Sequence, residues 1–132
     1  MKTILIVEDE LSIAEMLCAV LEDEGYKTTI ASNGQEGLAS LATSRPDLVL
    51  CDVMMPVLDG REMCRKMQAN PLYRSIPMVL MSAASTSIRR TDCNYAALLA
   101  KPFDLNEVLQ IIDQLIGGQE AVSETRFGGA AG

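Results

Sequence analysis

The feature that most constrains the fold is a run of four apolar residues, 48–51, which ends at Asp52 and is followed by a loop marked by Pro56 and Gly60. The run is too short for an ordinary helix, so it predicts a fully buried strand with Asp52 at its carboxyl end. In an open parallel α/β sheet, ligands bind in the crevice beyond the carboxyl ends of the strands. Asp52 is therefore our candidate for the reacting group.

Further short apolar segments predict strands at residues 3–7, 27–31, 76–81 and 96–100, and helical patterns separate them. Residues 12–24 carry apolar side chains at helical spacing, and so do the segments that follow Asn33, Asp59 and Asp104. Strands that alternate with helices form βαβ units, which predicts a doubly wound α/β domain with a five-stranded parallel sheet. We expect this domain over residues 1–117, with a short or irregular helix at 85–92 and a flexible tail or linker start at 118–132.

Composition limits the classes of protein to which the chain can belong. Its 132 residues suffice for one domain, and 18 acids against 11 Lys and Arg give a formal net charge of −7, which disfavours direct binding to nucleic acid. No apolar run approaches the roughly 20 residues of a membrane span, and no signal peptide follows Met1. The absence of His disfavours structural zinc, and cysteines inside apolar segments, such as Cys18 and Cys51, predict a cytoplasmic protein.

Polar side chains follow four of the predicted strands: Glu8 and Asp9 the first, Asp52 the third, Ser82 the fourth and Lys101 the last. The carboxyl ends of parallel strands meet at one edge of a sheet, so we expect these groups to lie close together. Carboxylates 4 Å apart repel by about 4 kcal/mol per pair at an effective dielectric constant near 20, so either one is protonated or a cation lies among them. Oxygen ligands without His or Cys select a hard ion, and Mg²⁺ suits such a site.

This set of groups suits phosphoryl transfer to a carboxylate. Asp52 can attack phosphorus to form an acyl phosphate, while Lys101 and a metal ion neutralise the phosphoryl oxygens and the Ser82 hydroxyl donates to one of them. Each residue alone is a weak signal, because an acid after a strand is more often a turn-former, and Asp9 could simply cap the first helix. The joint arrangement favours the functional interpretation.

Taken in order, these motifs resemble those of the receiver (CheY-like) domains of two-component response regulators. The resemblance covers residues 2–116 and rests on the motifs Glu8-Asp9, Asp52-Val53-Met54-Met55-Pro56, Asp59-Gly60, Ser82-Ala83 and Lys101-Pro102-Phe103. It implies a flavodoxin-like strand order 2-1-3-4-5. It also implies that the domain takes a phosphoryl group from a histidine kinase or phosphotransfer protein and changes a surface that a downstream effector protein reads.

The resemblance assigns roles to individual residues of this chain. Asp52 would be the phosphoacceptor, and Asp9, Asp52 and the backbone carbonyl of Met54 would bind Mg²⁺, with Glu8 reaching the ion mainly through water. Ser82 would be the switch hydroxyl and Lys101 the lysine that pairs with the phosphate. The family often has a cis peptide bond before the proline that follows this lysine, here Pro102.

Two features depart from the family pattern. Leu98 stands three residues before Lys101, where an aromatic switch residue is usual, and the segment between Ser82 and Lys101 is short for the family. Tyr95 is a candidate substitute for the missing ring. These departures motivate an alternative, a degenerate receiver that acts by binding alone.

A rival from another class is a Mg²⁺-dependent phosphohydrolase with an aspartyl nucleophile. Such enzymes typically carry a second Asp two residues after the first, and Met54 occupies that position. We therefore expect no turnover enzyme, but a domain that catalyses its own phosphorylation and loses the phosphate slowly.

Overall fold

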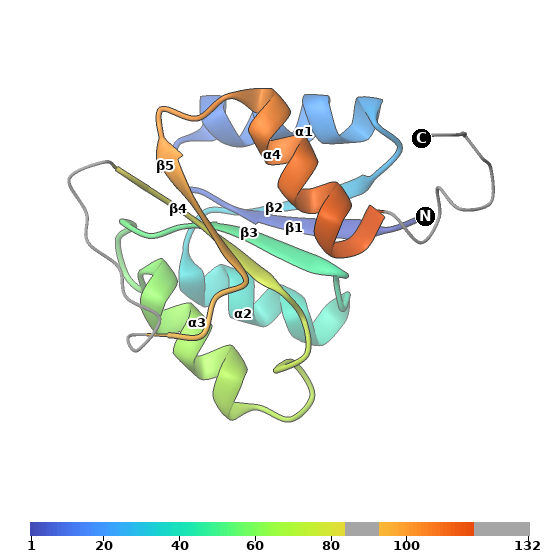
Figure 1. Cartoon of the computed structure of the whole chain (residues 1–132). Helices are drawn as coiled ribbons and strands as arrows, with labels where there is room; N and C mark the ends of the chain where they lie inside the picture. The colour runs from blue at the N-terminus through green and yellow to red at the C-terminus, as the bar shows by residue number, and fades with distance from the viewer. Residues whose placement is uncertain (84–92, 118–132) are drawn as a thin grey trace.

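The computed structural model describes residues 1–83 and 93–117, which form a parallel five-stranded sheet with helices on both faces (Figure 1). The strands are β1 (Thr3–Val7), β2 (Lys27–Ala31), β3 (Leu48–Asp52), β4 (Met78–Ala83) and β5 (Ala97–Lys101), in the order β2-β1-β3-β4-β5. The helices are α1 (Leu11–Asp23), α2 (Gly34–Thr43), α3 (Gly60–Ala69) and α4 (Leu105–Ile112), which continues into a π-helical turn at Asp113–Gly117. The expected fold class and strand order are confirmed.

The central strands are buried on both faces because their side chains alternate between two apolar layers. Figure 1 shows α1 and α4 on one face of the sheet and α2 and α3 on the other. The layer under α1 and α4 includes alternate strand residues, namely Ile4, Ile6, Leu48, Leu50, Val79, Met81 and Leu99. The layer under α2 and α3 takes the intervening ones, namely Leu5, Val7, Val49, Cys51, Met78 and Leu80. The central strands β1, β3 and β4 are buried along nearly their whole length, whereas the edge strands β2 and β5 are partly exposed.

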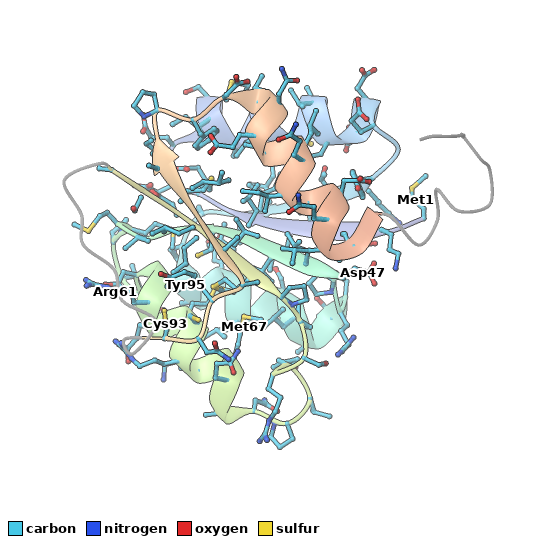
Figure 2. The ribbon with its side chains drawn as sticks, in the orientation of Figure 1. Met1, Asp47, Arg61, Met67, Cys93 and Tyr95 are labelled. Atoms are coloured by element: carbon cyan, nitrogen blue, oxygen red, sulfur yellow. The ribbon has the colours of Figure 1, made fainter. Side chains whose placement is uncertain are left out.

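The cysteines differ in their surroundings. Cys51 is fully buried, and Figure 2 shows Cys93 near Met67 and Tyr95 in the layer under α2 and α3. Tyr95 is 7% exposed, so its ring is part of this core. Cys18 packs against the apolar layer under α1 and α4, as expected; it is half-buried, and its thiol also lies 2.8 Å from the hydroxyl of Thr28.

Several boundaries differ from those expected. β4 begins at Met78 rather than two residues earlier, because Pro77 has no amide hydrogen to donate to a neighbouring strand, and it extends through Ala83. β5 runs one residue further than expected and ends at Lys101. The helix expected at 85–92 and the tail expected at 118–132 lie outside the described residues. No helix among the described residues is long and apolar enough to cross a membrane.

Candidate functional site

The carboxyl ends of the strands bring polar side chains to one edge of the sheet. Asp52 is the last residue of β3, Lys101 is the last residue of β5, and Glu8 directly follows β1. The parallel register aligns these ends, because Val7 pairs with Cys51, and Asp52 in turn pairs with Met81 on β4. The groups that the sequence placed at separate strand ends therefore share one edge.

An acidic cluster forms the centre of this edge. Glu8, Asp9 and Asp52 each offer a carboxylate oxygen, and these oxygens all lie within 4.8 Å of one another. Glu8 is 1% exposed and Asp52 is 6% exposed, whereas Asp9 is exposed, so the cluster opens to solvent on the Asp9 side. The alternative role of Asp9 as a helix cap is wrong, since the N-cap residue of α1 is Glu10 and no side chain caps this helix.

Lys101 connects the two buried acids of the cluster. Its Nζ lies 3.1 Å from Oδ1 of Asp52 and 3.4 Å from Oε1 of Glu8, so one ammonium group neutralises part of both charges. Burial alone lowers the pKa of Lys101, but the contacts with the two carboxylates outweigh it and raise that pKa. The peptide bond between Lys101 and Pro102 is cis, as the resemblance implies.

Burial is the main influence on both buried acids. It raises the pKa of Glu8, against a hydrogen bond from the Glu10 amide, and the nearby Asp52 raises it further. Burial likewise raises the pKa of Asp52, although Lys101 acts in the opposite direction. Burial thus disfavours the negative charge of both carboxylates, and a cation at this position would stabilise that charge.

We expect the metal-free protein to gain stability from Glu8 and Asp52 as the pH falls from neutral toward their ordinary carboxylate pKa of about 4. A raised folded-state pKa means that the folded protein binds more protons than the unfolded chain in this window, so acidification favours folding. Urea unfolding of the wild type and of Glu8→Gln across this pH range measures the contribution. As the pH falls, the free energy of unfolding of the wild type should increase relative to that of Glu8→Gln. A relative decrease would contradict a raised pKa of Glu8.

The remaining residues expected at the site lie on β4, on β5 and in the loop after β3. Ser82 lies in β4 and is 3% exposed, and its hydroxyl donates to the carbonyl of Ala83 at 3.4 Å. Met54 lies two residues after Asp52 and is 61% exposed. Leu98 is exposed on β5, where it pairs with Leu80.

The loop that follows Asp52 contains a strained turn that sequence reasoning missed. Val57 has a φ of 71°, and the amide of Leu58 donates to the carbonyl of Pro56 at 2.8 Å, which is the pattern of a γ-turn. A branched side chain in this region costs about 1–3 kcal/mol. The usual sequence signals for it, Gly or Asn, are absent at this position.

The same loop approaches Asp52 closely at its other end. The amide of Gly60 donates to the carbonyl of Val53 at 2.9 Å. A Cβ atom at Gly60 would lie 2.5 Å from the carbonyl oxygen of Asp52, so this position tolerates only glycine without a shift of the backbone. α3 therefore begins, at the Asp59-Gly60 pair, in close contact with the backbone of Asp52.

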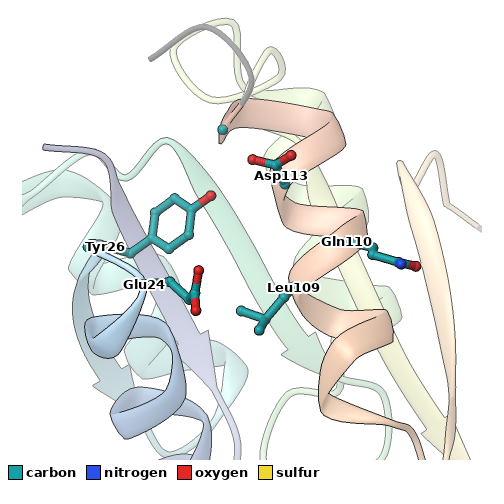
Figure 3. A pocket seen from close by; sticks show the side chains of 7 residues that line it. Glu24, Tyr26, Leu109, Gln110 and Asp113 are labelled. Carbon is teal, nitrogen blue, oxygen red and sulfur yellow. The ribbon is translucent and has the colours of Figure 1, made fainter. Parts of the chain in front are cut away.

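A separate pocket of about 520 Å³ lies between the end of α1 and α4. Figure 3 shows the side chains of Glu24, Tyr26 and Leu109 directed toward this pocket. Tyr26 immediately precedes β2, so the pocket lies at the amino edge of the sheet. It is therefore distinct from the acidic cluster at the carboxyl edge.

The fold is a doubly wound α/β domain with a parallel sheet. At the carboxyl edge of this sheet, acids and Lys101 surround the buried Asp52, an arrangement suited to hold a cation beside an anionic group. Comparison with known proteins gives the family. Residues 4–113 match the family model described as the response regulator receiver domain. The chain belongs to this family.

Individual relatives agree with this assignment. Response regulator Rre1 of Synechocystis is 34% identical over 128 residues, which cover 92% of this chain and 54% of that protein. Response regulator MprA of Mycolicibacterium vanbaalenii is 37% identical over 80% of this chain and 46% of its own length. The chain thus spans about half the length of these curated relatives.

Solved structures give the same result. The signal receiver domain of a signal transduction histidine kinase from Syntrophus aciditrophicus is 33% identical with a TM-score of 0.84, and the match covers 100% of both chains. The receiver domain of the sensor histidine kinase PA1611 from Pseudomonas aeruginosa is 30% identical with a TM-score of 0.80, over 88% of this chain and 98% of that one. That structure holds a magnesium ion in its active-site cleft.

Proposed function

We propose that the chain is a phosphoacceptor of a two-component system or phosphorelay, in which Asp52 takes a phosphoryl group from the phosphohistidine of a histidine kinase or phosphotransfer protein. A carboxylate oxygen of Asp52 forms a bond to phosphorus as the bond from phosphorus to the imidazole nitrogen breaks. The observation that carries this proposal is the contact of the buried Asp52 with Lys101 inside the acidic cluster. We assign the receiver domain to residues 1–117.

The residues at the site fit Mg²⁺. Three carboxylate oxygens lie within 4.8 Å of one another, and a donor set of oxygens alone suits a hard divalent ion. We assign the ion to Asp9, Asp52 and the backbone carbonyl of Met54, with Glu8 contributing mainly through water. When bound, the ion supplies neutralisation of negative charge on the phosphoryl oxygens.

Lys101 and Ser82 are the side chains that we expect to contact the phosphoryl group. Lys101 already lies 3.1 Å from Asp52, so it can pair with a phosphoryl oxygen added there. The hydroxyl of Ser82 donates to Ala83 and can turn to the phosphoryl group, because a phosphoryl oxygen is a stronger acceptor than a carbonyl. Such a turn would move the end of β4 next to β5, where Leu98 is 37% exposed. We assign this region to the surface that an effector protein reads.

Intact-mass measurement tests the proposal. The wild type, incubated with acetyl phosphate and Mg²⁺, should gain the mass of one phosphoryl group, and Asp52→Asn should gain none. Chelation of the metal should abolish the gain in the wild type. If no donor adds mass at Asp52, the alternative of a degenerate receiver that acts by binding alone is favoured. Repeated turnover of small phosphate esters would instead indicate a phosphohydrolase.

We expect the aspartyl phosphate at Asp52 to hydrolyse slowly, because the thioether of Met54 cannot align an attacking water. Replacing Met54 by Asn supplies an amide at this exposed position and should raise the rate of hydrolysis about tenfold. The decay of the phosphorylated mass after removal of the donor measures this rate. A phosphate lifetime of seconds in the wild type would contradict the expectation.

A further inference from the structure

The side chain of Val57 contributes little to the fold and occupies an unfavourable backbone position. It is 73% exposed, and its φ of 71° lies in a region that branched residues rarely adopt. Glycine or asparagine would adopt this conformation more easily. The fold itself therefore gives no reason for a valine at this position.

The surrounding structure imposes the turn. The carbonyl of Leu58 accepts a hydrogen bond from the amide of Gly34 at 3.1 Å, and a Cβ atom at Gly34 would lie 2.5 Å from the same oxygen, so the loop packs directly against the start of α2. At the other side, Gly60 is bonded to Val53. A loop held at both ends cannot relax by moving, so it keeps Val57 in the strained conformation and its side chain outward.

The loop that carries Val57 begins directly after Asp52. Asp52 is 6% exposed, and a phosphorus atom must come within about 3–3.5 Å of its oxygen before transfer. The loop leaves directly from Asp52, and its apolar side chains Met54 and Val57 are 61% and 73% exposed. Because Val57 lies five residues after Asp52, in a loop that returns to Val53 at Gly60, we expect a macromolecule that delivers a phosphoryl group to Asp52 to contact these side chains. A small donor needs no such contact.

We propose that Val57 is a specificity-determining residue, held outward by its strained turn to make an apolar contact with the protein that donates the phosphoryl group. This inference rests on the proposed function of Asp52 as phosphoacceptor. Backbone strain at an exposed position next to a reacting group is a recognised mark of function. The occupant is a histidine kinase or phosphotransfer protein that presents an apolar surface beside its phosphohistidine.

Two variants separate the side chain from the backbone. Val57→Thr keeps the branched shape and the backbone strain but replaces one methyl group by a hydroxyl. Val57→Asn relieves the backbone strain and also removes the apolar side chain. Leu72→Ser is the matched control, because Leu72 is 68% exposed in the loop before β4, at the opposite edge of the sheet. Each protein is phosphorylated with acetyl phosphate, and with those members of a panel of autophosphorylated histidine kinases and phosphotransfer proteins that label the wild type.

Both Val57 variants should accept phosphate from acetyl phosphate within about twofold of the wild-type rate and from the protein donor at least about tenfold more slowly. Leu72→Ser should match the wild type with both donors. Val57→Asn should also raise Tm by about 3 °C, and Val57→Thr should leave it nearly unchanged.

Unchanged transfer from the protein donor to Val57→Thr overturns the proposal, and so does an unchanged Tm for Val57→Asn. It is also overturned if acetyl phosphate labels the wild type but every protein donor fails. Failure of acetyl phosphate to label Asp52 in the wild type is a different result, because it contradicts the proposed function itself.

Discussion

Replacement of Lys101 by Ala should lower the rate at which Asp52 is phosphorylated by acetyl phosphate about 100-fold or more. The ammonium group lies 3.1 Å from Asp52, and it is placed to neutralise charge that develops on the phosphoryl oxygens. Removal of one such preorganised charge or donor typically costs 10²–10³ in rate, or about 2.7–4 kcal/mol. The time course of the phosphorylated mass, with saturating Mg²⁺, measures the rate.

The same variant should lower the stability of the metal-free protein. Glu8 is 1% exposed and would lose its pairing cation, and Asp52 would lose the opposite charge that favours its ionised form. An exposed pair contributes about 0–1 kcal/mol, and loss of one member of a fully buried pair costs about 3–5 kcal/mol. For the partly exposed Lys101 we expect about 1–3 kcal/mol.

Lys66→Ala is the matched control for Lys101→Ala, because Lys66 is exposed in the last turn of α3 and lies outside the acidic cluster. It should leave the phosphorylation rate within about twofold of the wild type. A wild-type rate for Lys101→Ala would remove this residue from the proposed mechanism. An equal loss for both lysines would indicate an effect of net charge rather than of the contact.

Replacement of Asp9 by Asn should have opposite effects on stability with and without Mg²⁺. Without the ion, the variant should be more stable than the wild type, because one charge is removed from three carboxylates within 4.8 Å of one another. Asp9 is exposed, so the gain is at most about 1 kcal/mol, below the value for fully buried charges. With the ion, the wild type should gain stability through binding and the variant much less.

Thermal unfolding at increasing Mg²⁺ concentration measures this reversal, and the two Tm curves should cross. Asp23→Asn is the control, because Asp23 ends α1 at the opposite edge of the sheet and should leave the response to Mg²⁺ unchanged. Phosphorylation of Asp9→Asn by acetyl phosphate should fall about 100-fold. Equal stabilisation of Asp9→Asn and the wild type by Mg²⁺ would show that the ion does not bind at this cluster.

The fold could be predicted to a large extent because its signals are local. β1, β2 and β3 have the expected bounds, since an apolar run that ends at a polar residue determines both the strand and its level in the sheet. In α1 the fully buried stripe runs through Ala14, Leu17 and Leu21, and Cys18 packs half-buried at the border of this stripe. Periodicity identifies a helix more reliably than it assigns a residue at the edge of its buried face.

The sequence predicted which residues of the candidate site follow the strands, but not which of their side chains contact one another. Sequence order places Glu8, Asp52 and Lys101 after separate strands, and the parallel sheet then brings them to one edge. The sequence contained no signal that Lys101 contacts Glu8 as well as Asp52, because Glu8 and Lys101 are 93 positions apart and β3 and β4 separate their strands. That contact depends on the twist and register of the whole sheet.

The sequence by itself determined which segments form strands and helices and which acids follow them, because hydrophobic periodicity and turn residues act over a few positions. Only the tertiary structure decided which side chains contact one another and which backbone conformation the loop after β3 adopts. It paired Lys101 with two buried acids, and it held Val57 in the left-handed region through the hydrogen bond between Gly34 and Leu58. Both outcomes arise from packing between elements that are distant in sequence, and such packing can impose a conformation that local preference opposes.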